Sequence, residues 1–474
     1  MNRIEKFICF EESSIRDAMR VIDTNARGIA FVVDSNGRMV GTISDGDIRR
    51  ALLAGYGLND RVQDHMNRDF VFAYQDAPPE EIKDKFSDRI TVIPIVTHDR
   101  KPVDYADYDR NQRIVVAQPQ MDGNEYKYLM DAFLSTWISS KGEYITRFEQ
   151  TFADYCGVKF GVATSNGTTA LHLALTALGI GPGDEVIVPD LTFAATINSV
   201  IYTGATPVIV DIEEDSWCIS PKAVEAAITP RTRAIIPVHL YGQPCDMEQI
   251  CRIAGEHGLY VVEDCAEAHG AEWNGKKVGS FGDIACFSFF GNKVVTTGEG
   301  GMCVTDDETL RKKLLLYRDH GMDPEKRYWH KVIGYNYRMT NLQAAIGLAQ
   351  VEHIEEILDW RKKLEDRYAE SFREIPGVRM QARDLKGRKK IAWLVSITVD
   401  PQDRDGIMDA LKKNSVESRP FFYTLSEMEI YRRYAADCPV SARISRSGLN
   451  LPTTYDMNNE KIDKIVAIIR SVVA

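Results

Sequence analysis

Residues 260–293, YVVEDCAEAHGAEWNGKKVGSFGDIACFSFFGNK, decide the fold of most of this 474-residue chain. The segment begins with a short apolar strand, Tyr260–Glu263, and a second apolar strand leads into a loop at Gly291–Lys293. Four similar strands precede it, at Gly161–Thr164, Glu185–Val188, Thr206–Val210 and Ala234–Pro237. Helical stretches separate these strands. Continuous apolar strands that alternate with helices predict an α/β fold, in which helices cover both faces of a parallel sheet.

A separate pattern fills the first hundred residues. Its apolar periodicity predicts a helix through Ile15–Ile22, strands at Gly28–Val33 and Met39–Ser44, and a helix through Ile48–Leu52. The order returns more faintly with a helix at Pro79–Phe86, a strand at Thr91–Val96 and a turn at His98–Arg100. We therefore expect a pair of α/β repeats that bury their sheets together.

The patterns along the sequence together predict a chain of three domains. The charged stretch Asp104–Asn111 is predicted to be a linker that ends the first domain, residues 1–112. The large α/β domain would then span residues 113–355. A helical run through Asn341–Ile375 leads to a smaller C-terminal domain, residues 356–474, with a strand predicted at Ile391–Val399.

Composition and charge limit the partners of the protein. The net charge is -11, which disfavours non-specific binding to nucleic acid, because that binding depends on neutralising phosphates with Lys and Arg. The charged N-terminus is not a secretory signal, and no stretch has the apolar length of a membrane span. The nine cysteines stand singly, and Cys245 and Cys251 lack metal-site spacing. We expect a cytoplasmic protein with reduced thiols and no metal site.

A glycine-containing turn connects a strand with a helix at Ser165–Thr169, SNGTT. Such a turn aims backbone N–H groups and the positive end of the helix dipole at one point, which suits a phosphate group. The helix predicted at Ala170–Leu178 would also need an ordinary N-cap, and Ser, Asn and Thr are common capping residues. The turn alone leaves both interpretations open.

Two charged residues follow apolar strands in the opening segment. Asp264 ends one strand, and ligands of an open parallel sheet bind beyond the carboxyl ends of its strands. A buried carboxylate there suits the protonated nitrogen of a pyridine cofactor, although caps and metal ligands use the same position. Lys293 stands among uncharged residues. Burial would lower its pKa from about 10.4 and favour a nucleophilic amine, whereas a solvated hairpin lysine is the alternative.

In this order the motifs resemble the DegT/DnrJ/StrS-type sugar aminotransferases, from about Val115 to the C-terminus. The resemblance is carried by GPGDEVIVPDLTFAAT (181–196), PVHLYGQPCDM (237–247), VVEDCAEAHGA (261–271), FSFFGNKVVTTGEGGM (287–302) and GYNYRMTNLQAAIGLAQVE (334–352). The last two segments, with WISSKGEYITRFE (137–149) and NGTTALHLAL (166–175), are most similar to the GDP-perosamine synthases within that family. This resemblance implies an aspartate-aminotransferase-type fold (PLP fold type I) and pyridoxal 5'-phosphate as cofactor.

The resemblance also implies roles for individual residues. Lys293 would be the Schiff-base lysine, and Asp264 would face the pyridine nitrogen. Glu267 would lie near the phenolic oxygen of the cofactor, where many relatives have Gln, and Phe193 would stack on its ring. The residues expected to hold the cofactor phosphate are Gly167, Thr168, Ser288 and Asn336. Asn336 would reach it from the neighbouring subunit, which implies a homodimer.

The implied reaction moves an amino group from glutamate, which becomes 2-oxoglutarate, to a 4-keto-6-deoxy sugar linked to a nucleotide. The preference for GDP-4-keto-6-deoxy-mannose over a UDP- or dTDP-linked sugar rests on the resemblance alone, and Tyr423 stands where those synthases have histidine. One rival is a pyridoxamine-dependent sugar dehydratase of the same fold, whose lysine is replaced by histidine. Another is a regulatory protein that only binds its ligands.

The N-terminal repeats resemble a CBS-domain pair, a module that commonly binds adenine nucleotides. Gly41, Ser44 and Asp47 in GTISDGD (41–47) match the family pattern, with Asp47 placed to accept hydrogen bonds from a ribose. In the second copy, KPVDYAD (101–107), Lys101 and Asp104 replace the Gly and the Ser or Thr. We therefore expect at most one site for a regulatory nucleotide. A docking or dimerisation module without a ligand is the alternative.

Overall fold

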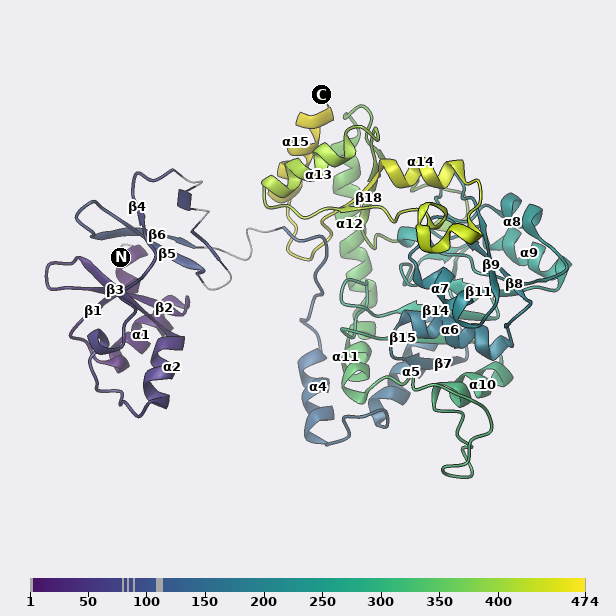
Figure 1. The fold of residues 1–474 in the computed structure, drawn as a ribbon, viewed down its shortest axis with the longest axis horizontal. Helices are drawn as coiled ribbons and strands as arrows, with labels where there is room; N and C mark the ends of the chain where they lie inside the picture. Colours follow the sequence, from purple (N-terminus) through teal and green to yellow (C-terminus); the bar gives the residue numbers. More distant parts are fainter. Residues whose placement is uncertain (1–2, 79–80, 83–84, 88–89, 108–113, 474) are drawn as a thin grey trace. The chain divides into compact units, whose positions relative to one another are not determined.

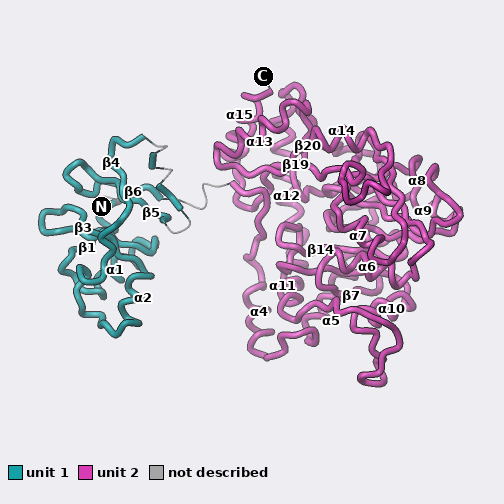
Figure 2. The backbone as a smooth tube through the Cα atoms, viewed as in Figure 1, with its two compact units in different colours: residues 1–113 teal, residues 114–474 magenta. Residues whose placement is uncertain are grey.

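The computed structural model describes residues 3–78, 81–82, 85–87, 90–107 and 114–473. The chain divides into two compact units, residues 1–113 and residues 114–474 (Figure 2). Half of the helix predicted at Pro79–Phe86, residues 79–80 and 83–84, lies outside the described residues.

The first unit contains two three-stranded sheets with the same pairing. In the first sheet, β1 (Ile8–Phe10) is parallel to β2 (Ile29–Val33), which is antiparallel to β3 (Met39–Ser44). In the second, β4 (Ala73–Tyr74) is parallel to β5 (Val92–Val96), which is antiparallel to β6 (Pro102–Asp107). The first copy also holds α1 (Ile15–Asn25), α2 (Asp45–Leu53) and two 3-10 turns, η1 (Arg3–Phe7) and η2 (Val62–Asp64). The shared pairing confirms the predicted repeat.

The linker predicted at Asp104–Asn111 is wrong for its first four residues. These residues belong to β6, where Asp104 lies opposite Ile95 and Asp107 opposite Val92. Charged side chains are common on the edge strand of a sheet, because one of its faces stays solvated. Tyr105 packs against Phe7, with 4.3 Å between ring centroids, which explains why this polar stretch folds back onto the unit. Residues 108–111 lie outside the described residues.

The centre of the second unit is a seven-stranded sheet of order β7-β15-β14-β11-β10-β8-β9. Its strands are β7 (Phe160–Thr164), β8 (Glu185–Pro189), β9 (Thr206–Val210), β10 (Thr232–Ile235), β11 (Tyr260–Asp264), β14 (Ile284–Ser288) and β15 (Gly301–Thr305). The prediction of a parallel sheet holds for the pairs from β9 to β14. It is wrong for β15, which is antiparallel to both β14 and β7. A loop without a crossover helix connects β14 with β15, so the chain returns in the opposite direction.

Helices cover both faces of this sheet, as predicted (Figure 1). They are α5 (Glu143–Cys156), α6 (Gly167–Leu178), α7 (Ala195–Tyr202), α8 (Pro221–Ala227), α9 (Met247–His257), α10 (Glu308–Arg318) and α11 (Asn341–Glu352). Helix α4 (Glu125–Leu134) packs against α11. Successive side chains of a strand point to opposite faces. In β14, Ile284 and Cys286 enter one hydrophobic core, whereas Ala285 and Phe287 enter the other. Burial on both faces explains why the strand is continuously apolar.

The C-terminal part of this unit has its own antiparallel sheet. Its strand order is β16-β18-β20-β19, with β16 (Arg379–Met380), β18 (Val395–Thr398), β19 (Arg419–Pro420) and β20 (Gly448–Leu451). The remaining elements are η4 (Leu240–Gly242), β12 (Glu272–Trp273), β13 (Lys276–Lys277), α12 (Ile354–Phe372), β17 (Arg388–Lys389), α13 (Arg404–Lys413), η5 (Leu425–Glu427), η6 (Glu429–Tyr434), α14 (Pro439–Ser447) and α15 (Asn459–Val473). Figure 1 shows α12 running towards α13 and α15. The domain boundary predicted at residue 355 falls within α12 and stays a prediction.

Among the described helices, none has both the length and the apolar composition of a membrane span.

Candidate active site

A cavity of about 710 Å³ lies at the carboxyl ends of β11 and β14, beside the first turn of α6. Seven of the predicted site residues line it, and they are Gly167, Thr168, Phe193, Asp264, Glu267, Ser288 and Lys293. In the sequence they are spread over residues 167–293. The parallel strands bring them together, because their carboxyl ends meet at one edge of the sheet.

The first turn of α6 is both a helix cap and one wall of this cavity. Asn166 caps the helix by accepting a hydrogen bond from the backbone N–H of Thr169 at 2.9 Å. A Cβ atom at Gly167 would lie 2.8 Å from the Cβ of Ser288, so only glycine allows the helix to approach β14 this closely. The positive end of the helix dipole therefore opens onto the cavity beside two hydroxyl side chains, those of Thr168 and Ser288. Such an arrangement suits a phosphate group.

Asp264 presents a buried carboxylate to the same cavity. Its side chain accepts hydrogen bonds from the hydroxyl of Thr196 at 2.9 Å and from the backbone N–H of Ala266 at 3.2 Å. Burial raises the pKa of Asp264, whereas these two hydrogen bonds and the nearby Lys293 oppose that rise. The hydrogen bonds fix the carboxylate in position, and a cationic ring nitrogen is the kind of partner that would stabilise its charge.

Lys293 and Glu267 form a buried pair in the middle of the cavity. The Nζ of Lys293 lies 3.6 Å from Oε1 of Glu267, and Oε2 of Glu267 accepts a hydrogen bond from the backbone N–H of Tyr241 at 2.9 Å. Burial lowers the pKa of Lys293, against the attraction of Glu267 and Asp264. Burial also raises the pKa of Glu267 to about 7, against the charge of Lys293. The side chain of Lys293 is only 10% exposed, which excludes the solvated hairpin lysine. The lowered pKa of Lys293 favours its neutral amine, the form that acts as a nucleophile.

Phe193 and Asn336 are exposed, unlike the other six predicted residues. Phe193 lies in the cavity wall with 59% of its surface exposed, 5.7 Å from the ring of Phe422. Asn336 is exposed on a loop before α11, where its side-chain oxygen accepts a hydrogen bond from Nε of Arg338. Asn336 is absent from the described residues that line the cavity. Its predicted reach into a neighbouring subunit stays a prediction.

Sequence reasoning missed the part of the cavity that the C-terminal sheet supplies. These residues are Trp393, Leu394, Arg419, Pro420, Phe422 and Asn450. Tyr423, which stands at the position of the synthases' histidine, is 56% exposed, and its neighbour Phe422 lines the cavity instead. No periodic pattern or local motif marks these positions, since they reach the cavity only through the packing of one sheet against the other.

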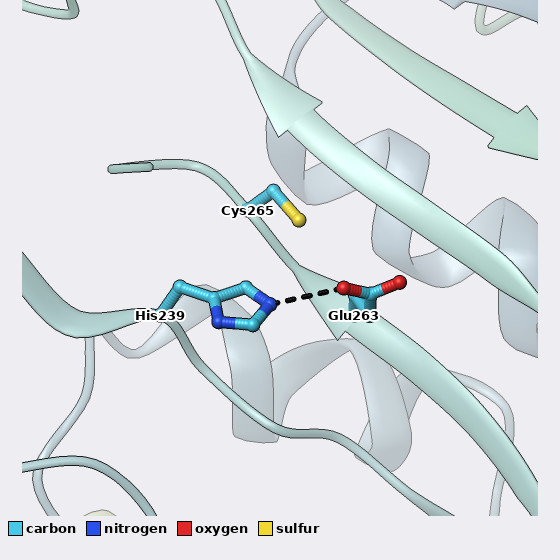
Figure 3. A group of neighbouring side chains, drawn as sticks. All are labelled: His239, Glu263 and Cys265. Atoms are coloured by element: carbon cyan, nitrogen blue, oxygen red, sulfur yellow. Dashed lines mark hydrogen bonds and ion pairs between the residues drawn. The ribbon is translucent and has the colours of Figure 1, made fainter. Parts of the chain in front are cut away.

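His239, Glu263 and Cys265 form a buried group with the spacing of metal ligands (Figure 3). The Nδ1 of His239 accepts a hydrogen bond from the backbone N–H of Cys245 at 3.0 Å, so Nε2 carries the proton and donates it to Glu263 at 3.1 Å. Glu263 also accepts from the backbone N–H groups of Gly279, Phe281 and Gly282. Burial opposes ionisation, but the hydrogen bonds that Glu263 accepts outweigh it and lower the pKa of Glu263. The ring nitrogens of His239 and the carboxylate oxygens of Glu263 thus already have hydrogen-bond partners within the protein.

His269, to which sequence reasoning gave no role, lies in the core. Its ring is fully buried, 5.4 Å from the ring of Phe287 and 5.7 Å from that of Phe289. Burial and the nearby charge of Lys293 lower the pKa of His269 to about 3, so the ring is neutral. It fills space beneath the cavity and does not enter it.

The first unit contains a second cavity, of about 450 Å³, lined by Ser44 and Asp47 together with Arg27 and Arg50. Ser44 and Asp47 also form the capping box of α2, in which Asp47 accepts from the N–H of Ser44 at 2.9 Å. The other oxygen of Asp47 accepts from Arg50. Gly41 is absent from the described lining, and a Cβ there would meet Sδ of Met66 at 2.7 Å. Gly41 therefore serves close packing.

Comparisons with known proteins agree with the geometry of both units. The DegT/DnrJ/EryC1/StrS aminotransferase family matches residues 119–470, and the CBS domain matches residues 1–54. GDP-perosamine synthase of Caulobacter vibrioides is 48% identical over 364 residues, which cover 76% of this chain and 98% of that protein. The crystal structure of DesV from S. venezuelae, in complex with a ketimine intermediate, is 32% identical with a TM-score of 0.70, covering 74% of this chain and 94% of DesV. A Streptococcus pneumoniae structure in its PLP form is 27% identical with a TM-score of 0.72, covering 76% and 98%.

The residues in the cavity fit the cofactor of this family. The turn at Gly167 offers a cradle for a phosphate, Asp264 offers a buried carboxylate for a ring nitrogen, and Lys293 offers a buried amine for an aldehyde. The family model matches most of the chain, and the GDP-perosamine synthase of Caulobacter vibrioides aligns along nearly its whole length. The chain is a pyridoxal-phosphate-dependent sugar aminotransferase that belongs to the DegT/DnrJ/EryC1/StrS family and carries a CBS domain at its N-terminus.

Proposed function

We propose that this enzyme converts GDP-4-keto-6-deoxy-mannose to the corresponding 4-amino sugar, with glutamate as the amino donor. The observation that carries the proposal is the 48% identity to a GDP-perosamine synthase along nearly the whole of that enzyme. The donor would first leave its amino group on the cofactor and depart as 2-oxoglutarate. The keto sugar would then take the group in the same cavity, so both substrates must fit there in turn.

The cavity supports a role for each predicted residue. When bound, the cofactor supplies an electron sink for the bond changes at the reacting carbon. Asp264 would keep its ring nitrogen protonated, and Glu267 would contact its phenolic oxygen. Lys293 would hold the cofactor in the resting enzyme and, once released, move a proton to or from the reacting carbon. Phe193 would cover the ring, while Gly167, Thr168 and Ser288 would bind the phosphate.

Arg419 supports an anionic donor. Among the described residues that line the cavity, it is the cation besides Lys293. Its guanidinium is held by Oε1 of Glu417 at 3.2 Å, and 43% of its side chain remains exposed. A planar guanidinium binds a carboxylate in two-point fashion, so we expect Arg419 to receive a carboxylate group of glutamate.

We further propose a homodimer in which Asn336 completes the cavity of the partner subunit. The loop that carries Asn336 also exposes Tyr328, Trp329 and Ile333, the last with 93% of its surface accessible. Trp137 and Ile138 are exposed as well. Large apolar side chains grouped on a surface commonly mark a subunit interface.

Mixing Lys293→Ala subunits with Asn336→Ala subunits tests the shared cavity. In a mixed dimer one of the two cavities keeps both residues, and about half of randomly paired dimers are mixed. Two inactive variants should therefore restore roughly a quarter of the wild-type activity when they are mixed. No restored activity in a mixture that forms dimers would contradict the shared cavity.

For the first unit we propose a regulatory nucleotide site at Ser44 and Asp47. The cavity there offers arginine side chains for phosphates and carboxylate oxygens for a ribose. Activity should respond to an adenine or guanine nucleotide in the full-length protein and lose that response in the Asp47→Ala variant. If both proteins respond equally, or neither binds nucleotide, the unit is a docking or dimerisation module.

The substrate is tested by offering the purified enzyme and glutamate a panel of GDP-, UDP- and dTDP-linked 4-keto sugars. Mass spectrometry of the products should show amination of the GDP sugar with the highest kcat/KM, and formation of one 2-oxoglutarate for each amino sugar. The Lys293→Ala variant is the control for non-enzymatic amination. Faster amination of a UDP- or dTDP-linked sugar would overturn the GDP assignment but leave the aminotransferase activity intact.

A further inference from the structure

Trp393 connects the C-terminal sheet with the lysine of the cavity. It lies two residues before β18, and its side chain is 4% exposed. The indole N–H donates a hydrogen bond to the backbone carbonyl of Asn292 at 2.8 Å. The Nζ of Lys293 lies over the indole ring, 3.9 Å from its centroid. One side chain therefore contacts both the loop that carries Lys293 and the amine itself.

Trp393 is itself fixed by two buried residues. On one side the ring of Tyr241 lies nearly parallel to the indole, with 6.1 Å between centroids and 19° between planes. Behind it, Nη1 of Arg361 donates to the backbone carbonyls of Trp393 at 2.7 Å and Ala392 at 3.3 Å. Tyr241 also holds Glu267 through its backbone N–H. Lys293, Trp393, Tyr241 and Glu267 thus form a closed ring of contacts.

Nearby charges and burial act on the ammonium form of Lys293 in opposite directions. Glu267 and Asp264 attract its ammonium form, whereas burial disfavours it. His269 is neutral at ordinary pH because burial lowers its pKa. An indole face attracts a cation through its negative quadrupole, so the ring of Trp393 adds to the two carboxylates in favouring the ammonium form. No other element supplies an aromatic face to Nζ among the described residues.

We propose that Trp393 is a positioning residue for Lys293. Its N–H holds the loop at Asn292, and its ring holds Nζ of Lys293 beside Glu267, so the C-terminal sheet aligns the reactive amine of the central sheet. The inference rests on the proposed role of Lys293. Two changes separate the contributions of the side chain: Trp393→Phe keeps an aromatic face and removes the N–H, and Trp393→Leu removes both.

The readout is the basicity of Lys293 in the cofactor-free protein. The protein is treated with acetic anhydride over a range of pH, and the acetylation rate of the peptide that contains Lys293 is measured by mass spectrometry. Trp393→Leu should lower the pH midpoint of this rate by about one unit, because the ring no longer favours the ammonium form. Trp393→Phe should leave the midpoint within about 0.3 unit and raise the Kd for pyridoxal 5'-phosphate about fivefold through loss of one hydrogen bond.

Trp273 offers a matched control. It is 7% exposed and also carries a cation, with Arg388 lying 5.4 Å from its ring centroid, but it lies outside the cavity. Trp273→Leu should change neither the midpoint nor the Kd. An unchanged midpoint in Trp393→Leu, or an equal shift in Trp273→Leu, would overturn the proposal. Because acetylation needs no substrate, this outcome is independent of the activity of Lys293→Ala, which tests the proposed function.

Discussion

Replacing Asp264 by asparagine removes one charge from the floor of the cavity with almost no change of shape. The carboxylate is 5% exposed and is held by the hydroxyl of Thr196 and the N–H of Ala266. The amide of asparagine keeps one acceptor oxygen, so one of these two hydrogen bonds is retained. The proposed partner of the carboxylate, the protonated ring nitrogen of the cofactor, loses its counter-charge.

The size of the effect follows from burial and distance. A pair of unit charges at about 4 Å is worth about 4 kcal/mol at the effective dielectric constant of 20 that suits such sites. If that amount is lost from the rate-limiting transition state, kcat/KM falls by about a thousandfold. The single lost hydrogen bond lowers the free energy of unfolding by only about 1 kcal/mol. We therefore expect a large kinetic effect in a protein that still folds and still binds the cofactor.

The assay compares kcat/KM, the yellow absorbance of bound cofactor and urea unfolding for wild type and Asp264→Asn. Asp190→Asn is the control, because Asp190 is 1% exposed, has its pKa raised to about 6 by burial, and accepts from the N–H of Ser426 outside the cavity. That variant loses a buried charge without facing the cofactor and should keep its rate within about threefold, as for an independent site. A rate for Asp264→Asn within tenfold of wild type would refute the reasoning, since another group must then hold the ring nitrogen.

The remaining predictions concern the lysine, its carboxylate partner and the first unit. Lys293→Ala should lose the yellow absorbance and all turnover, measured by spectroscopy and product formation; full activity would show that another amine holds the cofactor. In the cofactor-free protein, burial raises the pKa of Glu267 from 4.5 to about 7, so the folded state keeps a proton that the unfolded state has lost. The free energy of unfolding therefore falls as pH rises through this window. Measured by urea titration, this fall should be about 3 kcal/mol smaller in Glu267→Gln than in wild type. Identical pH profiles of the two proteins would contradict the raised pKa of Glu267. Removing residues 1–112 should leave a folded, yellow, active enzyme, because the cavity lies wholly within residues 114–474. An unfolded product in circular dichroism would show that the first unit is required for folding.

The sequence by itself determined the layers and the centre of the cavity. Strands buried on both faces must be apolar at every position, and this pattern is local, so β8, β9, β11 and β14 were predictable. The family resemblance placed Gly167, Asp264 and Lys293 in one cofactor site, and the structure brings them to one edge of the sheet, where the carboxyl ends of parallel strands meet. The glycine turn and the lysine by themselves left an ordinary cap and a solvated hairpin as alternatives, and the packing around the cavity decided between them.

Only the tertiary structure decided which distant segments complete the site. Asp104–Asp107 reads as a linker, yet β5 recruits it as an edge strand. Strand β15 is as apolar as its parallel neighbours, and its direction follows from the missing crossover helix. Trp393 contacts Lys293, and Arg419 lines the same cavity, although both lie a hundred residues or more further along the chain. Local periodicity records whether a side chain is buried, but which side chains it meets depends on how two sheets pack, and that is a property of the whole fold.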